Sequence, residues 1–303
     1  MEREGTDMRY EAAAALLPEE LRRAALTLPP PLRCRAEELR LRAGRPMTAL
    51  TGEEERPLPA TVTPRLLEEL CDRASEYSRY AAAETIRQGY LSVRGGFRLG
   101  LCGTAVIKGE ESTGMRQLSS AVLRIGREKT GIGRTLSPAL FKNGRFLSTL
   151  LLSPPGGGKT TLLRDLVRCL SDGDGCPARR VALLDERGEV AVMCGGIPQM
   201  EVGRRTDVLD GCPKALGIPV VLRAMNPQVI AVDEITRRQD LEAMVLSAGC
   251  GVGLLATIHA ADRRELEEKP LYRQLLAERV FSLAVCIRRQ ADGTRTYTVE
   301  ELE

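Results

Sequence analysis

The sequence is poor in aromatic residues and in histidine. It has no tryptophan, 3% aromatic residues in total and a single histidine, His259. Proteins that bind single-stranded nucleic acid stack the bases on aromatic side chains, so this composition offers little for such binding. The net charge of +3 is too small to argue for a nucleic-acid partner by itself. We therefore expect no specific nucleic acid among the partners.

Patterns for membrane insertion, a secretory signal and zinc binding are also missing. No apolar run approaches the ~20 residues that a membrane-spanning helix needs, and the polar start MEREGTDMRYE is not a secretory signal. The nine cysteines include no C-x-x-C pair, which argues against a zinc site or a disulfide framework. We expect reduced thiols and a cytoplasmic protein.

The chain of 303 residues is long enough for two domains, and its pattern changes along the sequence. In the first part, residues 63–83 begin with Thr-Pro and predict a helix, while EELRLRAGRP (37–46) passes from helix towards strand. GYLSVRGGFRLGLCGTAVI (89–107) alternates around Gly95-Gly96, which predicts a hairpin. We expect a small α/β domain over residues 1–115, a linker or junction over 116–137 and a second domain over 138–303.

Short apolar strands alternate with helical patterns in the second domain. The expected strands are RFLSTLLLS (145–153), RVALLDE (180–186), QVIAVDE (228–234) and GVGLLATIH (251–259), then LAVCIRR and RTYTVEE around an ADG turn (291–293). Continuous apolar strands of this kind predict an α/β fold with a mostly parallel sheet and helices on both faces. Such sheets bind ligands beyond the carboxyl ends of their strands, where the polar residues of interest lie.

The first of these strands leads into a glycine-rich loop and a helix, as in a P-loop (Walker A motif). Serine replaces the first glycine of G-x-x-x-x-G-K-[ST], at the strand exit rather than in the phosphate cradle. The glycines free the backbone to turn N–H groups toward an anion, and the helix N-terminus adds a favourable dipole. Lys159 would contact the β- and γ-phosphates and Thr160 would hold Mg²⁺. The expected nucleotide-binding residues are Ser153, Pro154, Pro155, Gly156, Gly157, Gly158, Lys159, Thr160 and Thr161.

The expected cofactors are ATP and Mg²⁺. The N-K-x-D motif that recognises guanine is impossible, because the only asparagines, Asn143 and Asn226, are followed by glycine and proline. ATP is therefore the default nucleotide.

Acidic residues and the single histidine follow three other strands. Asp233-Glu234 has the form of a Walker B element, in which Asp233 would accept a hydrogen bond from a Mg²⁺-bound water and Glu234 would act as general base. Asp185, Glu186 and Glu189 follow a second strand, and His259 ends a third. A lone histidine at a strand end is more often structural, but near a γ-phosphate it would sense the nucleotide.

A P-loop, an acidic box, a Walker B element and a strand ending T-x-H-A, in this order, resemble the secretion-type (type II/IV) ATPases. The stretches GRRTDVLDGCPKALGIPVVLRAMNPQVIAVDEI (203–235), SSAVLRIGRE (119–128) and GYLSVRGGFRLGLCG (89–103) sharpen the resemblance. Over nearly its whole length the sequence is similar to the stage III sporulation protein AA family.

The resemblance implies a RecA-like/AAA-type P-loop ATPase core that works as a homo-oligomeric ring, a hexamer. It implies a place on the mother-cell side of the membrane that faces the forespore, with peripheral attachment through partners. Those partners are the channel proteins of the sporulation stage III operon. There the ATPase would power or assemble a secretion-like channel during endospore formation.

The family's motifs carry over onto numbered residues of this chain. The P-loop falls on Ser153–Thr161, the acidic box on Asp185–Glu189, the Walker B element on Asp233-Glu234 and the histidine box on Thr257–His259. Many secretion ATPases have glycine in place of Asp233 and rely on the acidic box. Because both acidic elements are complete here, the general base is either Glu234, which we favour, or Glu186.

Ring ATPases also need a positive charge from the neighbouring subunit, because the transition state spreads charge over the γ-phosphoryl oxygens. Arg124 and Arg127 lie at the expected junction between the domains, where secretion ATPases carry such arginines. We favour them over Arg204, Arg205 and Arg223. For each of these arginines the alternative is an ordinary surface or domain-linking charge.

Two other functions remain open. A nucleic-acid-dependent ATPase of the RecA type would need base-stacking aromatics, or the arginine–histidine pair of an R3H module, and the only histidine already lies in ATIHA. A nucleotide-binding scaffold without turnover would have a damaged catalytic set, whereas Lys159, Thr160, Asp233 and Glu234 are all present.

Overall fold

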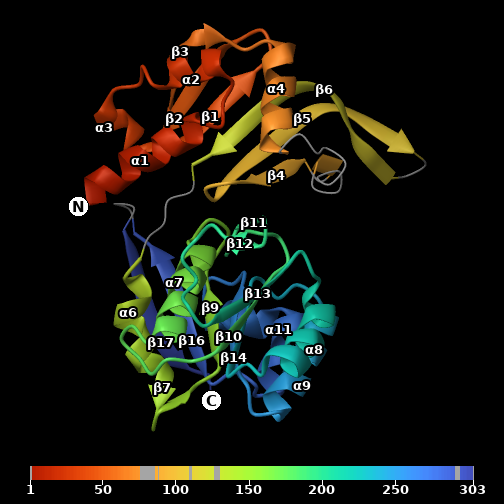
Figure 1. Cartoon of the computed structure of the whole chain (residues 1–303). Helices are drawn as coiled ribbons and strands as arrows, with labels where there is room; N and C mark the ends of the chain where they lie inside the picture. Colours follow the sequence, from red (N-terminus) through yellow and green to blue (C-terminus); the bar gives the residue numbers. More distant parts are fainter. Residues whose placement is uncertain are drawn as a thin grey trace. The chain divides into compact units, whose positions relative to one another are not determined.

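The computed structural model describes residues 2–75, 86–87, 89–108, 111–125, 130–290 and 294–302. The chain divides into two compact units (Figure 1). The first unit comprises Met1–Arg127 and Val192–Gln199, and the second comprises Glu128–Ala191 and Met200–Glu303. In the part of the chain that the structure describes, no helix is both long enough and apolar enough to cross a lipid bilayer.

The first unit is an antiparallel sheet packed with helices around one core. Its strands lie in the order β3 (Glu54–Thr61), β2 (Pro46–Thr51), β1 (Ala36–Arg42), β6 (Glu111–Arg124), β5 (Phe97–Lys108) and β4 (Tyr90–Val93). Its helices are α1 (Glu2–Ala14), α2 (Glu19–Ala25), α3 (Pro30–Arg33) and α4 (Pro64–Ala74). Buried residues of α1, α2 and α4, such as Tyr10, Leu21 and Leu67, share this core with Leu39 and Leu123 of the sheet.

Two local predictions for the first unit are confirmed. The Gly95-Gly96 hairpin joins β4 to β5, with Val93 paired to Phe97 and both glycines at positive φ. Helix α4 begins after Thr63, whose hydroxyl accepts a hydrogen bond from the Leu66 N–H. The rest of that predicted helix, residues 76–83, lies outside the described residues.

Two other expectations differ from the structure. Residues 36–42 are strand rather than helix passing into strand, because Leu39 and Leu41 alternate as buried positions between more exposed neighbours. The expected boundary at residue 115 falls inside β6, which pairs with both β1 and β5. Residues 116–125, which the sequence placed in a linker, therefore belong to the first unit.

The second unit contains a seven-stranded, mostly parallel sheet, as predicted. Its order is β13 (Thr206–Asp210), β10 (Val181–Asp185), β14 (Val229–Val232), β15 (Gly253–Ile258), β9 (Thr149–Leu152), β16 (Leu283–Arg289) and β17 (Arg295–Glu301). Only the last pair, β16 and β17, is antiparallel. The turn at 291–293 lies outside the described residues.

Helices cover both faces of this sheet. Its central strands β9, β10 and β14 are therefore buried at every position. One apolar cluster joins alternate residues of these strands to helices α8 (Lys214–Met225), α9 (Arg238–Gly249), α10 (Arg263–Glu268) and α11 (Pro270–Ala277). Helix α7 (Lys159–Asp172) contacts β9, β10 and β15, but its buried leucines are not in that cluster. It therefore packs on the other face.

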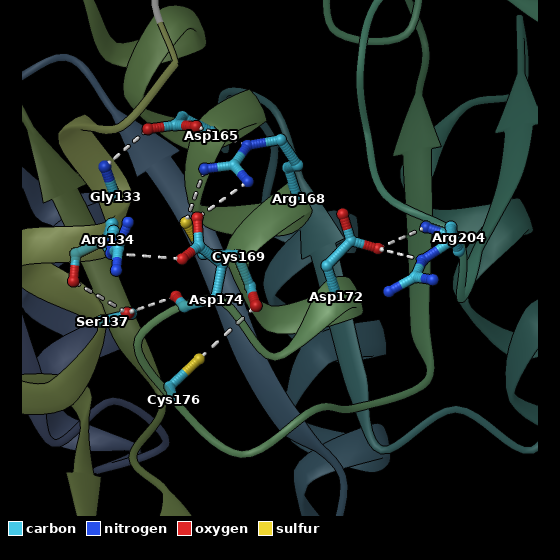
Figure 2. Close-up of polar contacts among 10 residues, drawn as sticks. All are labelled: Gly133, Arg134, Ser137, Asp165, Arg168, Cys169, Asp172, Asp174, Cys176 and Arg204. Carbon is cyan, nitrogen blue, oxygen red and sulfur yellow. Dashed lines mark hydrogen bonds and ion pairs between the residues drawn. The ribbon is translucent and has the colours of Figure 1, made fainter.

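The middle and the C-terminal end of α7 are fixed by a polar network (Figure 2). The buried Asp165 carboxylate accepts a hydrogen bond from the N–H of Gly133, 2.6 Å away, at the first turn of α6 (Ile132–Leu136). Arg168 donates to Asp165 and to Asp174, at 2.8 and 3.0 Å. The helix that starts at Lys159 is thereby anchored to α6 within the second unit.

Candidate active site

A pocket of about 390 Å³ lies at the carboxyl ends of the parallel strands of the second unit. It is lined by Pro155, Gly156, Gly158, Lys159, Thr160, Thr161, Arg187, Glu189, Asp233, Glu234, Thr257, His259 and Arg295. The loop after β9, the loop after β10 and the segments after β14 and β15 all contribute. Motifs from separate stretches of the sequence therefore meet at one place.

The loop between β9 and α7 depends on its glycines. Gly156 and Gly158 have φ of +73° and +105°, conformations that a side chain disfavours. At Gly157 a Cβ atom would lie 1.5 Å from the Oγ of Ser153, so a larger residue there would have to displace the serine side chain. Ser153 itself is fully buried and donates a hydrogen bond to the Pro154 carbonyl. The serine at the strand exit is therefore accommodated by the absence of a side chain opposite.

Lys159 lies at the start of α7 and is 6% exposed. Its Nζ donates to the carbonyl oxygens of Ser153 and Pro154, at 2.6 and 2.9 Å, and lies 2.8 Å from Nδ1 of His259. Burial lowers the pKa of Lys159, while the nearby carboxylates of Glu234 and Asp233 act in the opposite direction. A bound anion would stabilise the ammonium in this partly desolvated position.

Asp233 follows β14 and is held through one of its two oxygens. Oδ1 accepts hydrogen bonds from the Thr257 hydroxyl, at 2.9 Å, and from the Glu234 N–H, at 3.1 Å. Among the described residues, Oδ2 has no hydrogen-bond partner. Desolvation raises the pKa of Asp233, although the bond from Thr257 opposes it.

The free oxygen of Asp233 and the hydroxyl of Thr160 are the pocket groups best suited to hold Mg²⁺. This ion binds through one or two carboxylates and the oxygens of substrate phosphates rather than in an all-protein cage. A desolvated carboxylate with an uncommitted oxygen fits that requirement, because a cation would offset the cost of its charge.

Glu234 and His259 are in direct contact in the pocket. Glu234 has φ of +27°, and its N–H donates to the Thr257 hydroxyl at 2.8 Å, which holds this unusual backbone. Its Oε1 lies 3.0 Å from Nε2 of His259, and its Oε2 lies 3.3 Å from Arg187. With Lys159 protonated, Nδ1 of His259 accepts its hydrogen bond, so the proton of the neutral ring is on Nε2 and is donated to Glu234.

The acidic residues after β10 have different surroundings. The fully buried carboxylate of Asp185 accepts hydrogen bonds from the N–H groups of Glu189, Val190 and Ala191 and so shapes the following loop. Glu186 accepts a hydrogen bond from the buried Lys214 at 2.5 Å and is not among the residues that line the pocket. Burial alone would raise the pKa of Glu186, but the hydrogen bond and charge of Lys214 outweigh it, and the pKa is lowered.

The arginines singled out in the sequence are placed as follows. Arg124 lies on β6 of the first unit, with its Nε 3.5 Å from Glu38 and its side chain 64% exposed. Arg127 lies outside the described residues. Arg204 pairs with Asp172 at 3.3 Å, and the Arg223 guanidinium donates to the Pro219 carbonyl.

Sequence reasoning missed Arg187 and Arg295 as pocket residues. Arg187 directly follows the acidic pair after β10, so its position beside a strand end could have suggested it. Arg295 lies far along the chain from the other pocket residues, and no local pattern marks it.

Two solved structures share this fold. The pilus retraction motor PilT, solved with bound ADP, superposes with a TM-score of 0.61 and 17% identity, covering 88% of this chain and 78% of PilT. The ATPase DotB of Legionella pneumophila gives a TM-score of 0.57 and 14% identity, covering 88% of this chain and 77% of DotB. The fold and the pocket together define a P-loop protein with the fold of the secretion ATPases.

Sequence comparison assigns the chain to one family within this fold. The family model for sporulation stage III, protein AA matches residues 8–300. Stage III sporulation protein AA of Bacillus subtilis (strain 168) is 37% identical over 270 residues, which cover 88% of this chain and 87% of that protein. The chain belongs to the sporulation stage III, protein AA family.

Proposed function

We propose that this chain hydrolyses ATP with Mg²⁺ in the pocket of its second unit. The observation that supports this most strongly is the convergence of Lys159, Thr160, Asp233, Glu234 and His259 around one pocket. The fold, shared with PilT and DotB, is consistent with the proposal.

The loop and the helix N-terminus would hold the triphosphate. Backbone N–H groups of residues 156–161 and the dipole of α7 favour negative charge there. Lys159 would exchange its contacts with the carbonyls of Ser153 and Pro154 for phosphate oxygens. Thr160 and Asp233 would hold Mg²⁺, which neutralises phosphate charge when it is bound.

We assign the general base to Glu234 rather than Glu186. Glu234 lines the pocket, whereas the Glu186 carboxylate is occupied by Lys214. A carboxylate in the pocket can accept the proton of the attacking water. His259 contacts both Lys159 and Glu234, so it links the residue that would bind phosphate to the residue that would accept the proton. This supports its expected role as a nucleotide sensor.

We further propose that the chain works as a homo-oligomeric ring, a hexamer, in which a neighbouring subunit supplies Arg124 or Arg127 to the transition state. Family membership supports a role at the mother-cell side of the membrane that faces the forespore. There the ring would power or assemble a channel with the membrane proteins of the sporulation stage III operon, and peripheral attachment would go through those partners.

The enzymatic proposal is tested by phosphate release from ATP with purified protein. We expect turnover that requires Mg²⁺ and that falls to background when EDTA is added or when Lys159 is replaced by alanine. Unchanged turnover in K159A would refute the site, and absence of turnover in the natural protein would refute the activity.

A further inference from the structure

The hairpin formed by β16 and β17 extends beyond the carboxyl end of β9, toward the loop between β9 and α7. Cys286 of β16 pairs with Leu152, the last residue of β9, and β16 continues to Arg289. Arg289 pairs with Arg295, the first residue of β17. The end of the hairpin therefore extends beyond the end of β9, on the side where the loop begins.

Arg295 uses this position to contact the loop directly. Its Nε donates to the carbonyl oxygen of Gly157 at 2.8 Å. A Cβ atom on Gly158, the N-cap of α7, would lie 2.8 Å from the same Nε and 3.4 Å from Cζ. The guanidinium thus lies against the backbone at the N-terminus of α7, and Arg295 also lines the pocket.

In the part of the chain that the structure describes, no group accepts a hydrogen bond from the terminal nitrogens of Arg295, in contrast to the other cations of the pocket. Lys159 is engaged with two carbonyl oxygens and His259, and Arg187 is paired with Glu234. Among the described residues, the contact of Nε with Gly157 is the only side-chain hydrogen bond that Arg295 makes. With respect to these residues, its Nη1 and Nη2 donors remain available at a half-buried position beside the loop.

We propose that Arg295 binds the phosphates of the nucleotide from within the same chain, while its Nε holds the Gly157 carbonyl. The inference rests on the proposed nucleotide-binding function of this pocket. A guanidinium is always charged, and its planar fork matches the oxygens of a phosphate group. Arg295 adds to Lys159 and the helix dipole a positive group that is independent of assembly, whereas the charge from Arg124 or Arg127 would come from a neighbouring subunit.

Equilibrium binding of ADP and of AMP to the full chain tests this inference, with R295A, R295K and the control R288A. Arg288 pairs with Thr296 and is one position removed from the Arg289–Arg295 pair, so its exposed side chain lies on the opposite face of the hairpin. R288A therefore removes the same charge from the same hairpin without touching the loop. Thermal unfolding of each variant identifies any that fails to fold.

We expect R295A to weaken ADP binding by roughly tenfold or more, the size of a lost charge-assisted hydrogen bond. AMP binding should change less, R295K should recover part of the ADP affinity, and R288A should match the natural protein. Equal ADP affinity in R295A and the natural protein would overturn the inference. So would equal losses for ADP and AMP, which would indicate that Arg295 only shapes the loop. If the natural protein bound neither nucleotide, the proposed function itself would fail.

Discussion

Glu186 and Glu234 follow neighbouring strands, β10 and β14, but their carboxylates have different partners. Glu186 neutralises Lys214, a lysine that is 4% exposed at the start of α8. Glu234 lies in the pocket against His259 and Arg187. One carboxylate therefore stabilises a buried lysine, and the other lies in the pocket, where we propose that it acts as the general base.

Replacing each glutamate by glutamine separates these roles. We expect E234Q to bind ADP normally and to lose about 10²–10⁴-fold in turnover, because a general base contributes this much. E186Q should retain turnover within a few fold but lose about 1–3 kcal/mol of unfolding free energy, because Lys214 is left without its charge partner. Phosphate release measures turnover, and urea unfolding measures the free energy of unfolding. The opposite pattern would move the base to Glu186.

In the protein without bound nucleotide, the charged Asp233 carboxylate lowers the stability of the folded state. The cause is desolvation, which also raises the pKa of Asp233. We expect D233N to be more stable than the natural protein by about 1 kcal/mol at neutral pH, as is typical when a functional site is relaxed. Its Mg²⁺-dependent turnover should fall to background. Thermal unfolding and phosphate release, measured on the same preparations, test this trade-off.

The stability gain of D233N should also depend on pH. A raised pKa in the folded state means that the native protein keeps its proton to higher pH than the unfolded chain. The stability of the natural protein therefore falls as pH rises from about 3.9, the unfolded value, through the folded pKa. The difference between the two proteins should shrink as pH is lowered through this range, and a constant difference would contradict the assignment.

At the scale of the loop between β9 and α7, Ser153 and Gly157 are coupled. We expect G157A to destabilise the protein by about 1–3 kcal/mol and to weaken ADP binding, since its Cβ would overlap the Ser153 hydroxyl. S153G removes that obstruction, so the double variant S153G/G157A should recover most of the loss. A double-mutant cycle by urea unfolding gives the coupling energy. Strictly additive effects would show that the two residues do not interact.

Contiguous residues made much of the second unit predictable. Apolar strand runs marked β10, β14 and β15, and the loop 153–161 and Asp233-Glu234 stand directly at strand ends. The partners of these groups were not predictable, because they depend on how distant segments meet. Lys214 reaches Glu186 from α8, and Arg295 reaches Gly157 only because of the register between β16 and β9.

At the scale of the whole chain, the predicted fold class is confirmed by the structure and by its likeness to PilT and DotB. The division of the chain followed less well from local pattern. Residues 116–124 continue a strand whose partner, β1, lies far earlier in the sequence, as in the pair Leu39 and Leu123. Such long-range antiparallel pairing leaves no mark in the composition of the segment itself.

The central claim, a Mg²⁺-dependent ATPase that works as an assembled ring, concerns the whole molecule. Its most direct test is phosphate release from ATP measured across protein concentration, with K159A as the control and light scattering to follow assembly. We expect turnover per chain to rise as the protein assembles and then to level off, with K159A at background throughout. Turnover per chain that is the same in the dilute monomer would contradict the ring, and turnover no higher than that of K159A at every concentration would contradict the ATPase.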